Sequence, residues 1–346
     1  MVTRISNNMV YYNFLSSLNK SLNKQYTLQE QLADGKAIHR PSDDPVKTMR
    51  SLRFTVSLTE NEEYTKHVSD ARSWMETTDG ALYDINNVIQ SARELVIGGI
   101  EPNPAIAYET IAEQLDGLIN HMVELGNTKL GDRYIFAGQA DRMNSKPPFE
   151  RQNVPAAVAT AAGLFEADGV TPQTDQVVYN GDTQKISMVI KPGAVTPAQD
   201  SVNLTGQDLF GDPDTHALTA VDMDGDGTND TKICDVFNML IQIKQEFQKN
   251  PPDLTWLSGT GLGNIDKIHD QVLKAQTTIG SRSVAYEMAE NMLTKFNTQI
   301  NADIGANEDL DLSKGIVDFK TAETVYRTAL SVGARIMPVS LADFLN

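Results

Sequence analysis

An apolar repeat near the C-terminal end of the chain constrains the fold more than any other feature. Over residues 265–300, apolar side chains recur at alternating steps of three and four, and only Arg282 interrupts them. The repeat comprises Ile265, Ile268, Val272, Ala275, Ile279, Arg282, Tyr286, Ala289, Leu293, Phe296 and Ile300. A repeat of about five heptads predicts a long helix that packs along other helices as a coiled coil.

Shorter repeats of the same spacing predict five further helices, over residues 5–32, 46–97, 111–125, 236–247 and 319–336. The helix 46–97 carries its own boundary signals. Asp44 is placed to cap its N-terminus, Pro45 suits the first helical position, and Gly98-Gly99 follows its end. At 1.5 Å per residue, such a helix would be about 80 Å long. Long helical rods at both ends of the chain are therefore expected.

The middle of the chain has a different pattern. Short β-branched and aromatic runs predict strands over residues 133–137, 176–179 and 185–190. The last two runs flank Asn180 to Gln184, which predicts a hairpin with Gly181 in a left-handed turn. The glycine-rich residues 259–263 are interpreted as a loop that leads into the long helix.

These patterns predict a mainly α protein with a β-rich insertion. The N- and C-terminal segments form a long antiparallel helical bundle or coiled coil, which carries a small β-rich middle domain. The expected boundaries are 1–45 for an N-terminal polymerisation helix and turn, 46–130 with 262–312 for a helical rod, 131–261 for the middle domain, and 313–346 for a C-terminal polymerisation helix and tail. A stand-alone helical bundle is the simpler alternative.

The terminal helices need partners. The first helix has too few large apolar side chains to offset the conformational entropy that it loses on ordering alone. We expect it to pair with the C-terminal helix and with neighbouring copies, and we expect the apolar C-terminal tail to dock on another subunit. The predicted assembly residues are Tyr11, Leu15, Leu18, Leu22, Phe319, Tyr326, Ile336, Leu341, Phe344 and Leu345.

Charge and composition narrow the functional classes. The net charge of −17 disfavours nucleic acid as a partner, because it would repel phosphate groups. No segment approaches the roughly 20 apolar residues that a membrane span requires. The first residues lack the apolar core of a signal peptide, so we expect a protein that leaves the cell without a cleaved leader or stays in the cytosol. The single cysteine, Cys234, excludes a disulfide framework and is interpreted as a small buried residue.

No catalytic pattern emerges. The five histidines (His39, His67, His121, His216 and His269) are scattered, and no phosphate-binding glycine loop or nucleophile motif occurs. The sequence therefore predicts neither an enzyme nor a bound cofactor.

One acidic loop resembles part of a calcium site. Asp222, Asp224, Asp226 and Asp230 supply the carboxylate spacing of the first half of a calcium loop. Counting from Asp222, position 12 is Ile233, so the expected bidentate acid is missing. Counting from Asp224, Asn229 replaces the turn glycine. The loop is a candidate calcium site, with a solvated acidic turn as the alternative.

Four motifs resemble the flagellin superfamily and, within it, its hook-associated junction proteins. Leu32-Ala-Asp-Gly-Lys36 with Arg40-Pro-Ser-Asp-Asp-Pro45 is similar to the turn after the family's first helix. Gly131-Asp-Arg-Tyr-Ile-Phe-Ala-Gly138, followed by a Pro-Phe149 segment, resembles its entry into the variable domain. Val178-Tyr-Asn-Gly-Asp182 resembles a family hairpin, and Tyr326 to Leu330 with Ser340 to Leu345 resembles its C-terminal end.

The resemblance implies a structural protein without catalytic residues that joins the flagellar hook to the filament. It further implies export through the flagellar type III apparatus, a cytosolic export chaperone on the C-terminal segment, and an extracellular ring of copies. That ring would contact a hook-side junction protein and flagellin. The acidic loop at 222–230 has no role in this picture.

Two alternatives stay open. Filament flagellin is a near one, although PSDDP and GDRYIFAG favour the junction proteins. A calcium-dependent binding module or adhesin built on the middle domain is the alternative from another class.

Overall fold

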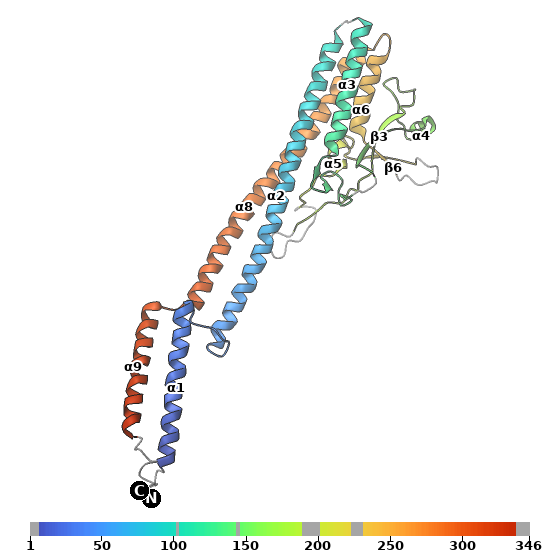
Figure 1. Ribbon diagram of the computed structural model, residues 1–346. Helices are drawn as coiled ribbons and strands as arrows, with labels where there is room; N and C mark the ends of the chain where they lie inside the picture. The colour runs from blue at the N-terminus through green and yellow to red at the C-terminus, as the bar shows by residue number, and fades with distance from the viewer. Residues whose placement is uncertain (1–6, 102–103, 143–145, 189–200, 223–230, 337–346) are drawn as a thin grey trace, which may run out of the picture. The chain divides into compact units, whose positions relative to one another are not determined.

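The computed structural model describes residues 7–101, 104–142, 146–188, 201–222 and 231–336. The chain divides into two compact units (Figure 1). Unit 1 combines residues 1–62 and 294–346, and unit 2 comprises residues 63–293. Long helices thus come from both ends of the chain and a small sheet from its middle, as the sequence predicts.

The longest helices are α2 (Pro45–Ile100) and α8 (Leu262–Glu308), which contribute to both units. Within unit 2 they run antiparallel, because Arg72 pairs with Glu290 and Arg93 pairs with Asp266 at 2.8 Å. The predicted repeat of α8 is buried from Ile265 to Leu293, with Arg282 and Ala289 half-buried. Beyond Leu293, in unit 1, Phe296 is 50% exposed.

The start of α2 confirms the predicted cap. Asp44 Oδ1 accepts hydrogen bonds from the backbone N–H groups of Val46 and Lys47, each at 3.0 Å. Asp43 Oδ2 accepts two more, from His39 and Arg40, which hold the pKa of the Asp43 carboxyl below its usual value. The two bonds to Asp44 satisfy N–H groups that a helix start leaves without partners, and the two bonds to Asp43 hold the preceding turn.

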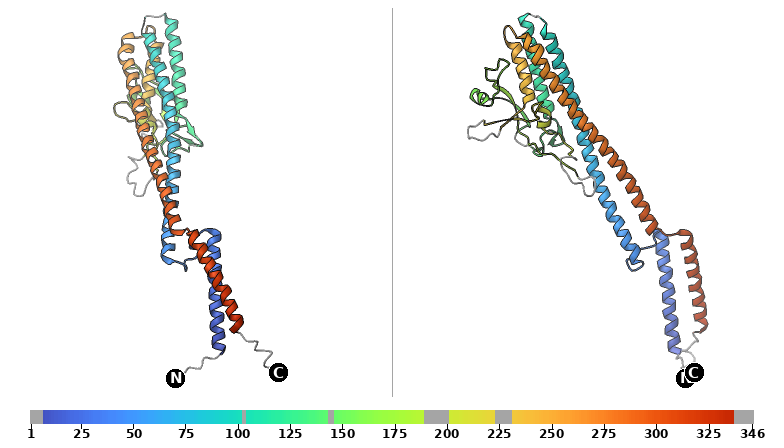
Figure 2. Two further views of the ribbon diagram at one scale, coloured as in Figure 1. Left: turned by 90° about the vertical axis from the view of Figure 1, so that its left-hand side faces the viewer. Right: turned by 180° about the vertical axis from the view of Figure 1, so that it is seen from behind.

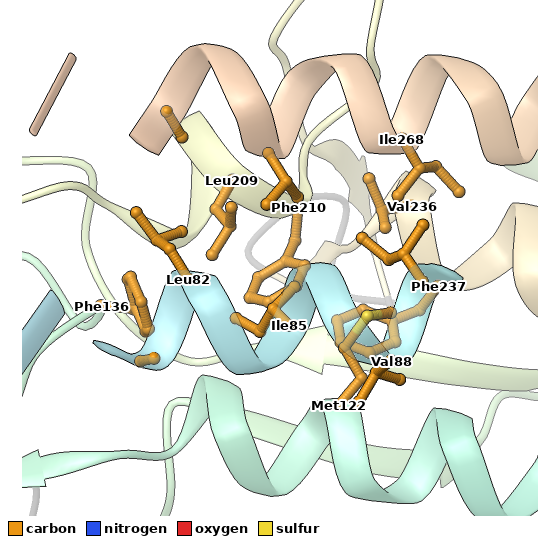
Figure 3. Packing of buried hydrophobic residues seen from close by; sticks show 14 of the residues in the cluster. Leu82, Ile85, Val88, Met122, Phe136, Leu209, Phe210, Val236, Phe237 and Ile268 are labelled. Atoms are coloured by element: carbon orange, nitrogen blue, oxygen red, sulfur yellow. The ribbon is translucent and has the colours of Figure 1, made fainter. Parts of the chain in front are cut away.

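Helices α3 (Ala105–Gly126) and α6 (Asp235–Gln248) pack against each other and complete the helical part of unit 2. Between the helices and the middle segment lies the hydrophobic core, where Leu82, Ile85 and Val88 of α2 meet residues of the other elements (Figure 3). Phe237 of α6 is fully buried, with its ring centroid 4.8 Å from that of Phe210.

The middle segment forms a four-stranded antiparallel sheet and a two-stranded hairpin. The sheet has the order β3-β4-β6-β5, and Figures 1 and 2 show it beside α3 and α6. Its strands are β3 (Phe149–Asn153), β4 (Asp175–Tyr179), β5 (Thr219–Val221) and β6 (Thr231–Ile233). The hairpin joins β1 (Lys129–Leu130) to β2 (Arg133–Tyr134), and two short helices, α4 (Ala156–Ala161) and α5 (Gly206–Phe210), flank the sheet.

The strand prediction for 133–137 is right only for its first two residues. Ile135, Phe136 and Ala137 leave the strand and are all fully buried, so they do not alternate between core and solvent. The carbonyl oxygen of Phe136 accepts hydrogen bonds from Tyr179 Oη at 2.8 Å and from the Gly206 N–H at 2.9 Å. The motif is a buried turn rather than a strand.

The predicted hairpin around residues 180–184 is wrong. Strand β4 pairs with β3 and β6, and Gly181 is not in the left-handed region. The turn is instead held by Asp182, whose backbone N–H donates to Ala137 O and whose Oδ1 accepts from the Gln139 N–H at 2.7 Å. Contacts with a distant segment therefore replace the local pairing.

The glycine-rich segment 259–263 is helical, which corrects the predicted loop. Helix α7 (Leu254–Trp256), capped by Asp253, continues through a π-helical turn η1 (Leu257–Gly261) into α8. Leu257 is fully buried, and this anchor in the core outweighs the low helix propensity of the glycines.

An ionic cluster joins the sheet to the helices of unit 2. Arg151 of β3 donates to Asp175 of β4 and to Asp116 of α3, and Lys244 of α6 donates to the same two carboxylates at 3.0 and 3.1 Å. Hydrogen bonding to Arg151 lowers the pKa of Asp116. Both cations also lower the pKa of Asp175, against the opposing effect of burial. Two cations thus neutralise two half-buried acids where four elements meet.

Unit 1 contains α1 (Asn7–Asp34), α9 (Leu312–Ile336) and the adjoining ends of α2 and α8. Helices α1 and α9 lie side by side in every view (Figures 1 and 2) and pack against each other. Ala322, at 7% exposure, is the only fully buried apolar side chain among the described residues of this unit. Unit 1 therefore has almost no hydrophobic core of its own.

Candidate assembly surfaces

Two glycines determine how α1 and α9 pair. A Cβ placed on Gly333 would overlap the ring of Phe14, and one on Gly315 would lie 2.9 Å from Leu310 and 3.2 Å from Leu32 of α1. Phe14 precedes Leu32 by 18 residues, and Gly315 precedes Gly333 by the same interval, so both contacts belong to one antiparallel register. The helices approach closely at both ends of the pair because glycine has no side chain there.

The same register aligns the half-buried side chains between these contacts, which we call the seam. In this register Leu18 lies opposite the small residue Ala329, and Leu28 lies opposite Phe319 as a pair of large apolar residues. The α1 side of the seam comprises Phe14, Leu18, Ser21, Gln25, Leu28 and Leu32, and the α9 side comprises Gly315, Phe319, Ala322, Tyr326, Ala329 and Gly333.

The predicted assembly residues fall into three groups. Leu18, Phe319 and Tyr326 belong to the seam inside one chain, and Leu15 is half-buried at its edge. Leu22 is 41% exposed, outside the seam. The side chains of Tyr11 and Ile336, and all of Leu341, Phe344 and Leu345, lie outside the described residues.

The outer face of α1 carries exposed large apolar side chains among polar ones, and the predicted assembly residues included only Leu22 of them. Tyr12 and Tyr26 are 69% and 72% exposed. We call Tyr12, Leu22 and Tyr26 the tyrosine stripe.

A second exposed apolar face lies on α9, and none of its residues is among the predicted assembly residues. Val317, Val325 and Val332 are 63%, 54% and 44% exposed, and threonines 321 and 328 lie between them. Both threonine hydroxyls donate at 2.8 Å to the carbonyl oxygen four residues earlier. Their polar groups are thereby satisfied within α9, and the methyl groups remain for contacts outside. We call Val317, Thr321, Val325, Thr328 and Val332 the valine–threonine stripe.

The first turns of α2 add a third exposed apolar face within unit 1. Val46, Met49, Leu52 and Val56 recur at steps of three and four and are 56–70% exposed. The helical periodicity of these residues is a signal that could have identified this face from the sequence.

The two connections between long helices are joined to each other at one point. The Ala37 N–H donates to Glu308 O at 2.6 Å, and the Leu310 N–H donates to Gly35 O at 2.8 Å. Glu308 also accepts from Ser51 Oγ and from Lys36 Nζ, and these bonds lower the pKa of its carboxyl. This joint ties both connections together at the base of the α1/α9 pair.

The candidate calcium loop stays a prediction. Asp222 is described, whereas Asp224, Asp226 and Asp230 lie outside the described residues. Among the side chains that the structure does place, no group of three or more His, Cys, Asp or Glu residues could hold a metal ion. Burial raises the pKa of nearby Asp235 to about 6, although Thr219 Oγ1 donates to its carboxylate at 2.8 Å.

None of the described helices combines the length and the apolar character needed to cross a membrane. The single cysteine is fully buried, as predicted.

Comparison with known proteins gives a family match for the N-terminal part of the chain. Residues 5–141 match the family model of the bacterial flagellin N-terminal helical region. The chain is flagellin-like. Among curated relatives, flagellar hook-associated protein 3 of Salmonella typhimurium is 27% identical over 139 residues, which are 39% of this chain and 43% of that protein. A flagellin of Salmonella rubislaw is 34% identical over 82 residues, 24% of this chain and 17% of the relative.

The flagellin-like chain therefore matches less than half the length of these curated relatives. Solved structures cover more of it. Flagellar hook-associated protein 3 from Legionella pneumophila has a TM-score of 0.54 at 15% identity, over 73% of this chain and 97% of the other. FlgL from Xanthomonas campestris has a TM-score of 0.53 at 15% identity, over 73% and 99%. These structures share the fold of long helices with a small sheet.

Proposed function

We propose that this flagellin-like chain is a structural, non-enzymatic component of the bacterial flagellum that joins the hook to the filament. The curated match to hook-associated protein 3 extends over more residues than the match to flagellin. Copies of the chain assemble through unit 1 into a ring. The neighbours of the ring are a hook-side junction protein and flagellin.

The main support for this proposal is that unit 1 has a small hydrophobic core and large exposed apolar faces. Helices α1 and α9 contact each other along the seam, and three apolar faces of the unit stay exposed. In the described part of the unit, Ala322 is the only fully buried apolar side chain. Burial of apolar surface is the main favourable term in folding, so such a unit gains most of its stability when other subunits cover it. Unit 2, in contrast, has an extensive core of its own.

The proposal includes export of the chain through the flagellar type III apparatus and binding of its C-terminal segment by a cytosolic chaperone. A unit with little core unfolds at small cost, which suits passage through a narrow type III export channel. The apolar C-terminal segment would be bound by a cytosolic chaperone until export, and the assembled protein would be extracellular on the flagellum.

Immunogold electron microscopy of isolated flagella tests the location. An antibody against the chain is expected to label the hook–filament junction, and flagella from a strain without the gene give the background. Labelling along the whole filament would contradict the proposal and favour flagellin.

Deletion of the last ten residues tests the assembly role. We expect the monomer to keep its melting temperature and to fail at capping the hook, because the tail docks on a neighbour. Normal filaments on cells that carry only the truncated chain would contradict this role.

A further inference from the structure

We propose that the valine–threonine stripe of α9 in one copy binds the tyrosine stripe of α1 in a second copy of this chain. The inference rests on the proposed function and specifies which surfaces meet in the assembly. Exposed apolar residues on both helices motivate it, since Tyr26 is 72% and Val317 is 63% exposed in the single chain.

The two stripes lie on opposite sides of the α1/α9 pair. At 100° per residue, the tyrosine stripe lies about 120° around α1 from the seam, and the valine–threonine stripe lies about 130° around α9 in the opposite rotational sense. Because antiparallel helices are viewed from opposite ends, these opposite senses correspond to opposite sides of the pair. The stripes of one chain therefore cannot meet each other.

A contact between different surfaces of identical copies is heterologous, and its repetition produces a ring or a helix of copies. One copy presents its valine–threonine stripe on one side and its tyrosine stripe on the other, which is the arrangement that such repetition requires. An isologous dimer would bury only one of the two stripes and leave the other exposed.

The stripes also match in length and chemistry. Tyr12 and Tyr26 are about 21 Å apart along α1, and Val317 and Val332 are about 22 Å apart along α9. The threonine hydroxyls of α9 are bonded to their own helix, so the stripe presents short branched side chains with outward methyl groups. The two tyrosine rings and Leu22 can pack on such a surface, and the threonine hydroxyls are not left unpaired there because they bond within α9.

Photo-cross-linking in assembled flagella tests the pairing. Benzoylphenylalanine is incorporated at Tyr26 of the full chain, and cross-linked peptides are identified by mass spectrometry. We expect a product of twice the chain mass in which Tyr26 is joined to residues 317–332. The matched control places the same probe at Gln25, on the seam, and should join α9 within one chain near Ala322.

The possible outcomes separate the two proposals. If the chain is present at the junction but Tyr26 cross-links to a different protein or outside α9, the pairing is wrong and the proposed function stands. If the chain is absent from flagella, both are wrong.

Substitutions provide an independent measurement, the fraction of hooks that carry the chain. Thr321→Glu should lower this fraction at least tenfold with unchanged monomer circular dichroism. Ala334→Glu, on an exposed position away from the stripe, should leave it near the wild-type value. Thr321→Val should also preserve it, because the hydroxyl is used only within α9. Equal loss in the glutamate variants, or loss with Thr321→Val, would overturn the pairing.

Discussion

Matched truncation of two phenylalanines tests where the stability of the monomer resides. Phe237 is fully buried in unit 2 and contacts the ring of Phe210. Phe319 is half-buried on the seam of unit 1. The substitutions Phe237→Ala and Phe319→Ala remove the same atoms, so differences between them report the environment and not the chemistry of the change.

The expected magnitudes differ severalfold. Truncation of a fully buried phenylalanine costs about 3–5 kcal/mol, which corresponds to roughly 6–20 °C in melting temperature for a unit of this size. Truncation of the half-buried Phe319 costs about 1 kcal/mol and acts on unit 1. We therefore expect Phe237→Ala to lower the main calorimetric transition of the monomer strongly, and Phe319→Ala to leave it nearly unchanged.

Differential scanning calorimetry of the purified monomer gives the comparison, and hook capping in cells gives the functional control. Phe319→Ala should impair capping despite its small effect on the main transition. If both variants lowered that transition equally, unit 1 would be part of the cooperative core, and the reasoning behind assembly-dependent stabilisation would be refuted.

Four further predictions concern single groups. Arg151→Ala should lower the free energy of unfolding by about 2–4 kcal/mol at pH 7 and by progressively less as the pH falls below 3.8, because Asp116 and Asp175, whose native pKa values are lowered from 3.8, become protonated there; urea titration at pH 7 and in strong acid measures this. Asp235→Asn should raise the melting temperature at pH 7.5 and change it little at pH 4. The native pKa of about 6 exceeds the unfolded value of 3.8, so the stability cost of the acid begins as the pH rises above 3.8 and is complete above about pH 6. Gly333→Ala should reduce the protection of α9 in amide exchange despite the better helix propensity of alanine, and Phe14→Ala in the same chain should restore it; no change in the single variant would contradict the register. Asp44→Ala should cost about 1 kcal/mol in the first turn of α2, visible as faster exchange of its amides.

The long helices, the start of α2 and the end of α1 were readable from the sequence because local interactions determine them. Asp44 and Pro45 begin α2 as predicted, and Asp34 ends α1 before Gly35, whose φ is +71°. The 3–4 repeat from Ile265 to Leu293 identified the buried face of α8, because residues that recur at steps of three and four lie on the same face of a helix.

Strand pairing and the seam were decided by tertiary structure. The segment after β4 follows a distant turn at Phe136 instead of closing a hairpin, because buried hydrogen bonds from Tyr179 and Asp182 hold it there. On α1, apolar residues occupy more than one face, and periodicity alone could not choose between them. The face of α1 that contains Phe14 packs on α9, because Gly333 lets the two helices approach closely there.

The sequence by itself thus determined the positions and the amphipathic character of the long helices, because these depend on residues within one or two turns of each other. Only the tertiary structure decided which apolar face of a helix is buried against another helix of the chain and which stays exposed. The physical reason is that packing depends on the shapes of two surfaces brought together, and neither helix contains that information alone.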